Sequence, residues 1–183
     1  MEDLTKKTWL EAALNGHWTQ NRQPGIPVRV EEIVQQGIDC VNAGAAIVHV
    51  HAYDEDTGQQ NDDVDVYKRI IDGIRSKVDA VVYPTVSLPG MNPNVDRSSV
   101  KERFAHIESL AKDGFLEWTV LDPGSSNFAH YDDLKEDKLG YVHTNPESDI
   151  RHGLRIAREY GLHPSFAVYE PGFARLGATL HWR

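Results

Sequence analysis

The sequence has almost no cysteine. Of its 183 residues only Cys40 is one, which excludes an internal disulfide and a cysteine-rich zinc module. It also lacks any apolar run near the ~18 residues that identify a membrane-spanning helix. The first residues, Met1 to Lys7, do not follow the basic, apolar and small-residue order of a signal peptide. We therefore expect a soluble protein of the reducing cytoplasm, with no membrane partner.

Basic residues are few relative to acidic ones. The chain has 19 Lys and Arg against 28 Asp and Glu, which gives a formal net charge of −9. A protein that binds phosphate backbones needs a basic face, so we expect no nucleic-acid partner. Hydrophobic residues make up 40% and charged residues 26% of the chain, as in ordinary globular proteins. The length suffices for a sizeable core, and we expect a single domain over residues 1–183.

Apolar, β-rich segments alternate with longer helical patterns along the chain. The expected strands are 8–14, 45–51, 80–86, 115–121 and 165–169. The expected helices are about 29–42, 64–77, 96–112 and 146–160, with a last one after Gly172. We expect a long loop between the fourth strand and the helix at 146. This alternation is typical of an α/β fold with a parallel sheet.

The spacing of the expected strands bears on the architecture. They begin about 34 to 50 residues apart, a spacing that suits successive units of a TIM (β/α)₈ barrel. Eight such units would need roughly 280 residues, close to the ~250 of a typical barrel. This chain ends at Arg183, shortly after the fifth strand. Spacing alone leaves two architectures open: a shorter open sheet, or about the first five βα units of a barrel.

The segment His49-Val50-His51 is the strongest chemical signal. Side chains two apart on a strand project to the same face, so both imidazoles can converge on one atom. They also lie at the carboxyl end of their strand, where α/β folds place ligands and catalytic groups. Neutral imidazoles are good zinc ligands, and a third ligand with a water would complete a catalytic site. The alternative is a pair of hydrogen-bonded core histidines.

Other polar residues stand in or just after the remaining strands. The candidate site residues among them are Glu11, Asn15, His17, Thr85, Ser87, Asp122 and Glu170. At the carboxyl ends of barrel strands they would form one ring around the barrel mouth. The alternative is that these polar residues simply lie where each strand ends at the solvent. The remaining histidines are scattered singly and we expect most of them on the surface: His106, His130, His143, His152, His163 and His181.

Several segments, in order along the chain, resemble one known family. They are Leu14-Asn15-Gly16, Pro24-Gly25-Ile26-Pro27, Ala43 to His51, Thr85, Asp122-Pro123-Gly124-Ser125-Ser126-Asn127-Phe128 and Val168-Tyr169-Glu170-Pro171-Gly172. Together they resemble the β-keto acid cleavage enzymes, whose prototype is the 3-keto-5-aminohexanoate cleavage enzyme of lysine fermentation. The resemblance covers nearly the whole chain, so it is much more specific than the two histidines alone.

That resemblance implies a TIM barrel that is usually oligomeric, with a homotetramer favoured, and that binds one catalytic divalent metal ion, normally zinc. The matching metal ligands are His49 and His51. The family's third ligand is a glutamate near a late strand, and its proposed catalytic aspartate and arginine also belong to the carboxyl-terminal part. We therefore expect a chain truncated at its carboxyl end, whose catalytic acid and base are unknown.

The resemblance also implies a reaction in which a β-keto acid condenses with acetyl-CoA to give acetoacetate and a new acyl-CoA. Glu170 matches a substrate-site glutamate, Thr85 replaces a serine and Asp122 replaces an asparagine of the prototype. His17 stands where the aminohexanoate enzyme has a glutamate suited to a cationic amine, and Tyr53 replaces a common arginine. Both of these departures argue against an amino-bearing substrate.

Two other functions are compatible with the sequence. Because the last three βα units are absent, the 183-residue chain could be a non-catalytic remnant or scaffold whose open sheet edges are prone to aggregation. Another metal-dependent TIM-barrel lyase or aldolase would process its substrate without acetyl-CoA. Dependence on coenzyme A separates that last alternative from the cleavage enzyme.

Overall fold

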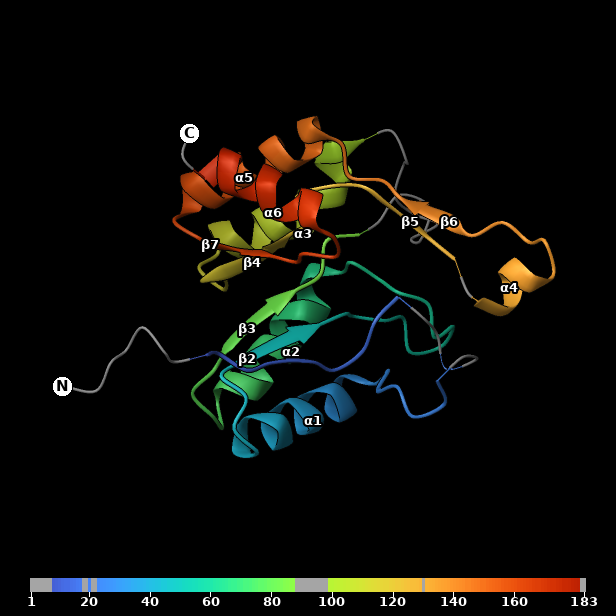
Figure 1. The fold of residues 1–183 in the computed structure, drawn as a ribbon. Coiled ribbons are helices and arrows are strands. Elements are labelled where there is room, and N and C mark those ends of the chain that lie inside the picture. Colours follow the sequence, from blue (N-terminus) through green and yellow to red (C-terminus); the bar gives the residue numbers. More distant parts are fainter. Residues whose placement is uncertain (1–7, 18–19, 21–22, 88–98, 130, 182–183) are drawn as a thin grey trace.

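The computed structural model describes residues 8–17, 20, 23–87, 99–129 and 131–181. Its strands and helices alternate in a mixed α/β fold with two parallel sheets and one hairpin (Figure 1). Among the described residues, no helix is both long and apolar enough to cross a bilayer.

The first sheet contains three parallel strands in sequential order. They are β1 (Glu11–Ala13), β2 (Ile47–Val50) and β3 (Val81–Pro84). Helices α1 (Val30–Asn42) and α2 (Val64–Arg75) pack together on one face of this sheet (Figure 1). In β2, Val48 and Val50 are fully buried within the hydrophobic core, as the alternation of side chains along a strand requires. His49 therefore points to the opposite face, where it pairs in register with Tyr83.

The second sheet pairs β4 (Trp118–Leu121) with β7 (His163–Phe166) in parallel. Helices α3 (Val100–Lys112), α5 (Glu147–Tyr160) and α6 (Pro171–His181) lie around it (Figure 1). β3 and β4 lie side by side, but no ladder joins them in the described part of the chain.

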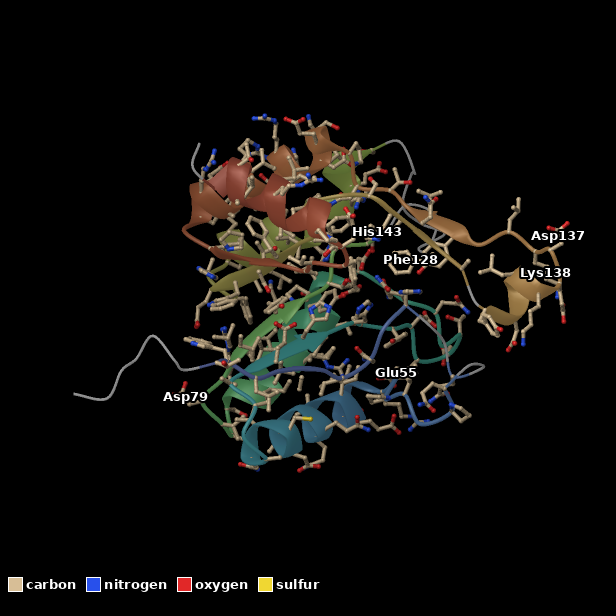
Figure 2. All side chains as sticks on the ribbon, in the orientation of Figure 1. Glu55, Asp79, Phe128, Asp137, Lys138 and His143 are labelled. Atoms are coloured by element: carbon tan, nitrogen blue, oxygen red, sulfur yellow. The ribbon has the colours of Figure 1, made fainter. Side chains whose placement is uncertain are left out.

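An antiparallel hairpin interrupts the alternation after β4. It consists of β5 (Ser126–Phe128) and β6 (Tyr141–His143), with the short helix α4 (Tyr131–Lys135) between them. Figure 2 shows that Phe128 and His143 lie near the body of the protein, whereas Asp137 and Lys138 lie at the far end of the projecting arm. Because a long loop was expected here, the hairpin corrects that prediction.

Local sequence determines where the helices begin and end. The Asp63 carboxylate accepts hydrogen bonds from the main-chain amides of Asp65 and Val66, so it caps the first turn of α2. Gly161 ends α5 with a φ of 68°, in the left-handed region that glycine adopts without steric cost.

Every strand and helix that the sequence predicts is present, with altered bounds. The four earlier strands lie within their expected ranges, whereas β7 begins two residues before the expected start at Ser165. The described part of the third helix begins at Val100, and residues 88–98, which include its expected start, lie outside the described residues. The α/β class with parallel strands is confirmed. That these units form the first five of a barrel stays a prediction.

Gly153 allows α5 to pack directly on β4 and α3. A Cβ atom at this position would lie 2.4 Å from Leu121 Cδ1 and 2.8 Å from Phe104 Cε1. The substitution Gly153→Val overpacks this contact, and we expect it to lower the free energy of unfolding by about 2 kcal/mol. Urea denaturation measures the change, with Arg158→Val on the exposed side of α5 as the control. Equal effects of the two substitutions would contradict this packing.

Candidate functional site

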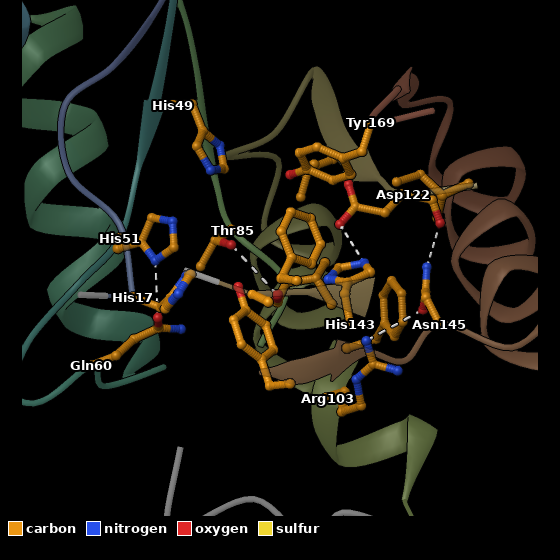
Figure 3. Close-up of a pocket in the computed structure, with 17 residues that line it drawn as sticks. His17, His49, His51, Gln60, Thr85, Arg103, Asp122, His143, Asn145 and Tyr169 are labelled. Atoms are coloured by element: carbon orange, nitrogen blue, oxygen red, sulfur yellow. Dashed lines mark hydrogen bonds and ion pairs between the residues drawn. The ribbon is translucent and has the colours of Figure 1, made fainter. Parts of the chain in front are cut away.

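A cavity of about 390 Å³ opens at the carboxyl ends of β2, β3 and β4. Figure 3 shows His49, His51 and Gln60 on one wall and Asp122, His143 and Asn145 on the other. The opposite end of the first sheet, near Asp79, is remote from it (Figure 2). The full lining is His17, His49, His51, Gln60, Thr85, Val86, Arg103, Phe104, Val120, Leu121, Asp122, Phe128, Ala129, Tyr141, His143, Asn145 and Tyr169.

The two histidines of β2 and its end face the cavity together. Their ring centroids are 5.3 Å apart and the ring planes are nearly perpendicular, at 85°. Burial, with His51 beside it, lowers the pKa of His49 to about 3. Burial likewise lowers the pKa of His51 to about 4. Since both values lie below the ordinary 6.5, both imidazoles are neutral at pH 7 and each keeps one nitrogen lone pair.

Asn15 fixes the main chain at His51. Its side-chain amide donates to the carbonyl oxygen of His51 at 3.1 Å, and its side-chain oxygen accepts from the His51 main-chain N–H at 2.8 Å. The same amide also donates to the carbonyl oxygen of Pro27, at 3.2 Å. Asn15 therefore replaces a neighbouring strand at the point where β1 has ended, and it holds His51 in position.

A series of hydrogen bonds extends from the His51 ring through Gln60 and Ser87 to Asp62. Nδ1 of His51 is 2.9 Å from Oε1 of Gln60. Nε2 of Gln60 lies 3.2 Å from the Ser87 hydroxyl oxygen, and that hydroxyl contacts the carboxylate of Asp62. The Ser87 side chain is fully buried.

On the opposite wall, Asp122 is the central charged group. Its Oδ2 atom lies 3.1 Å from Nε2 of His143, and its Oδ1 atom is buried without a hydrogen-bond partner. The side-chain amide of Asn145 donates to the main-chain oxygen of Asp122, and the Asn145 main-chain N–H donates to the Ser125 hydroxyl at 2.8 Å. These contacts connect the end of β4 to the end of the hairpin.

Arg103, from α3, donates hydrogen bonds to residues next to both cavity walls. Only 2% of its side chain is exposed. Its Nε donates to the main-chain oxygen of Ser87 at 2.8 Å, Nη1 to the carboxylate of Asp149 at 2.5 Å and Nη2 to Asn145 at 3.4 Å. A guanidinium of this geometry therefore holds the end of β3, the start of α5 and the segment after β6 together.

Aromatic rings complete the cavity wall. Phe128 stacks on Tyr141 with ring centroids 5.4 Å apart, and Tyr169 contacts Phe128 edge-on at 5.7 Å. Burial, reinforced by the nearby carboxylate of Asp122, raises the pKa of Tyr169 to about 12. Its phenol therefore stays protonated at pH 7 and can donate a hydrogen bond.

The structure brings some of the expected site residues together. His17, Thr85 and Asp122 line the cavity with the two β2 histidines. Asn15 and Ser87 lie outside the lining, and each contacts the residues that support His51, as described above.

Two further expected site residues also lie outside the lining. Glu11 is exposed and accepts a hydrogen bond from the Tyr83 hydroxyl at 2.8 Å. Glu170 is exposed, and its main-chain oxygen accepts from the Phe173 N–H at the start of α6. Their substrate-binding roles stay predictions.

The cavity is also lined by polar residues that were not among the expected site residues, including Gln60, Arg103, His143 and Asn145. His143 and His106 are 4% and 3% exposed, which corrects the expectation of a surface position for these two histidines. His106 places Nε2 2.7 Å from the main-chain oxygen of Thr85 and stacks on Tyr67. For the second wall the sequence indicated Asp122 but neither His143 nor Asn145.

For the metal site expected from the sequence, the two candidate ligands His49 and His51 lie in the cavity lining. In the described segments, no group of three or more His, Cys, Asp or Glu side chains is placed to hold an ion. The donor chemistry of the two neutral imidazoles fits zinc, and His49 Nδ1 is buried without a hydrogen-bond partner. The pair therefore fits part of a zinc site, and it needs at least one further ligand.

Comparison with known proteins decides the family. The beta-keto acid cleavage enzyme family matches residues 7–182, nearly the entire chain. The chain belongs to this family. The resemblance drawn from the sequence segments is thereby confirmed.

Two curated proteins similar to this chain are named as acetyl-CoA-dependent transferases. The chain is 27% identical to the 3-dehydrocarnitine:acetyl-CoA trimethylamine transferase of Rhizobium meliloti (strain 1021), over 92% of this chain and 57% of that protein. It is 30% identical to the 3,5-dioxohexanoate:acetyl-CoA acetone transferase of Paraburkholderia graminis, over 83% of this chain and 50% of that protein. The chain thus spans about half the length of the curated relatives it matches.

A solved structure with a similar fold is that of ObcA in a ternary complex with a C4-CoA adduct and oxalate. The TM-score is 0.65 at 21% sequence identity, and the match covers 87% of this chain and 34% of that one. This likeness shows that ObcA and this chain share a fold.

The buried Arg103 provides a stability test of the two-wall arrangement. Replacing it with methionine leaves the carboxylate of Asp149 without its buried partner, so we expect Arg103→Met to cost about 3 to 5 kcal/mol of unfolding free energy. The control is Arg155→Met, which breaks the Arg155–Glu159 pair on the surface and should cost less than about 1 kcal/mol. Chemical denaturation measures both. A cost for Arg103→Met as small as that of the control would show that the buried ion pair does not hold the walls together.

Proposed function

We propose that the protein cleaves a β-keto acid in a reaction with acetyl-CoA, which yields acetoacetate and a new acyl-CoA, and that a bound zinc or other divalent ion assists this reaction. Family membership supports the reaction class, and two relatives carry acetyl-CoA in their names. The observation that carries the proposal is the pair of neutral imidazoles, His49 and His51, on one wall of the cavity.

The metal ion in this proposal is held by His49 and His51. When bound, it would supply a positive charge that polarises the keto group and stabilises a developing enolate. Neutral imidazoles suit this role because, unlike thiolates, they do not cancel the charge of the ion. The third ligand and the catalytic acid and base are proposed to lie in the remainder of the family's fold, since this chain covers only 57% and 50% of the two relatives named above.

The other cavity residues are proposed to hold the substrate. The protonated phenol of Tyr169 is suited to donate a hydrogen bond to a carboxylate or keto oxygen of the substrate. The Thr85 hydroxyl, which lies 3.4 Å from the main-chain oxygen of Val86, is proposed to donate to the substrate in place of that contact. The carboxylate of Asp122 is suited to a donor group, since one of its oxygens has no partner. His17 lies at the cavity edge and is proposed to contact the distal end of the β-keto acid.

The wider setting follows from the family and stays a proposal as well. We place the parallel units β1 to β3, β4 and β7 in a (β/α)₈ barrel of which they are the first five strands. We propose a cytoplasmic homo-oligomer, with a tetramer favoured by the family resemblance.

The direct test is turnover by a purified protein that includes the remainder of the family's fold. Incubated with zinc, acetyl-CoA and a panel of β-keto acids, it should form acetoacetate and a matching acyl-CoA, both measured by mass spectrometry. The variant His51→Asn should reduce turnover more than about 100-fold, because loss of a residue that merely supports a ligand already costs 10- to 100-fold. Zinc content, measured by elemental analysis, should drop with it.

The matched control is His163→Asn, because His163 is an exposed histidine at the opposite end of a strand from the cavity. It should keep wild-type turnover and zinc content. Turnover without acetyl-CoA would replace the proposal with a lyase or aldolase reaction. Absence of turnover by the folded, zinc-loaded protein across the panel would favour a non-catalytic scaffold.

A further inference from the structure

The carboxylate of Asp62 determines which atom donates and which accepts in each hydrogen bond between Asp62, Ser87, Gln60 and His51. A carboxylate can only accept, so the Ser87 hydroxyl must donate its proton to Asp62. The Ser87 oxygen is then left with lone pairs and accepts from the Nε2 amide of Gln60, at 3.2 Å. The same amide lies 3.4 Å from Oδ1 of Asp62, a second acceptor on the same side.

This direction extends through the Gln60 side chain to His51. Because the NH₂ group of Gln60 faces Ser87 and Asp62, its carbonyl oxygen Oε1 must face the imidazole, 2.9 Å from Nδ1 of His51. A carbonyl oxygen can only accept, so Nδ1 must carry a proton. In a neutral imidazole the other nitrogen, Nε2, then keeps its lone pair, which faces away from Gln60.

Other contacts hold the Gln60 side chain and Ser87 in the positions that give this direction. The isolated bridge between Tyr53 and Gln60 returns the chain beside His51, and Gln60 is only 7% exposed. Arg103 donates to the main-chain oxygen of Ser87 at 2.8 Å, which fixes the backbone that carries the hydroxyl, and the Ser87 side chain is fully buried. Figure 3 shows the His51–Gln60 contact on the wall that also presents His49.

We propose that Gln60, oriented by Ser87 and Asp62, is a positioning residue that fixes His51 in the Nδ1–H tautomer and so makes Nε2 the nitrogen available to a divalent ion. The role in metal binding rests on the proposed function, whereas the tautomer itself does not. Neither Gln60 nor Asp62 touches the ion or the substrate in this arrangement. Their effect passes through the imidazole alone.

The tautomer is measured by ¹⁵N NMR of the metal-free protein labelled at histidine, because protonated and unprotonated ring nitrogens resonate far apart. Wild-type His51 should carry its proton on Nδ1. Gln60→Leu removes the acceptor and should shift His51 toward the Nε2–H form, with a 10- to 100-fold loss in zinc affinity. Gln60→Glu restores an acceptor and should recover the Nδ1–H form.

Two further variants complete the test. Gln59→Leu makes the same change at an exposed neighbouring position and should alter neither the tautomer nor zinc affinity. Asp62→Ala frees the Ser87 hydroxyl to donate to Gln60, so the Gln60 amide can turn over. The Nε2–H form of His51 should then increase, although Asp62 itself makes no hydrogen bond to the His51 ring.

The outcomes separate this inference from the proposed function. A proton on Nε2 in the wild-type protein, or an unchanged tautomer in both Gln60→Leu and Asp62→Ala, would overturn the inference. An altered tautomer with unchanged zinc affinity would overturn its role in metal binding. Lack of turnover with β-keto acids would instead overturn the proposed function and leave the tautomer result standing.

Discussion

The arrangement of the cavity depends on the buried guanidinium of Arg103. It donates to the end of β3 through Ser87, to α5 through Asp149 and to the segment after the hairpin through Asn145. Ser87 is far in sequence from Asn145 and Asp149, and no strand ladder among the described residues joins β3 to the part of the chain that holds those two. Such a group is expensive to bury, and it is retained because one planar fork satisfies several acceptors in fixed directions. The positions of both cavity walls follow from it.

The fold was largely predictable because its strands and helices carry local signals. β2 reads as a buried strand, and α2 begins at the capping Asp63 and has a clear amphipathic pattern. The hairpin was not predictable, since β5 and β6 are three residues each and their side chains do not alternate between apolar and polar. β7 includes Pro164 and begins earlier than its apolar residues indicate. Pairing with β4 determines its bounds, and no local pattern records that pairing.

The candidate site was predictable in part for the same reason. His49 and His51 stand out because side chains two residues apart on a strand lie on the same face. This rule is local and can be applied to the sequence alone. Arg103 looks like any charged residue of an amphipathic helix, and only tertiary packing makes it 2% exposed. Gln60 and His143 likewise acquire their places from long-range contacts, with Ser87 and Asp122 respectively. The strand pattern singled out this histidine pair, and the structure added Gln60, whose Oε1 lies 2.9 Å from Nδ1 of His51.

The central claim is that His49 and His51 together bind a divalent ion at the wall of this cavity. The most direct measurement is X-ray absorption at the zinc edge of the zinc-loaded protein. The account predicts two imidazole nitrogens at about 2.0 to 2.1 Å from the ion, recognisable by the multiple scattering of the histidine rings. A first shell of oxygen atoms with no imidazole scattering would contradict it.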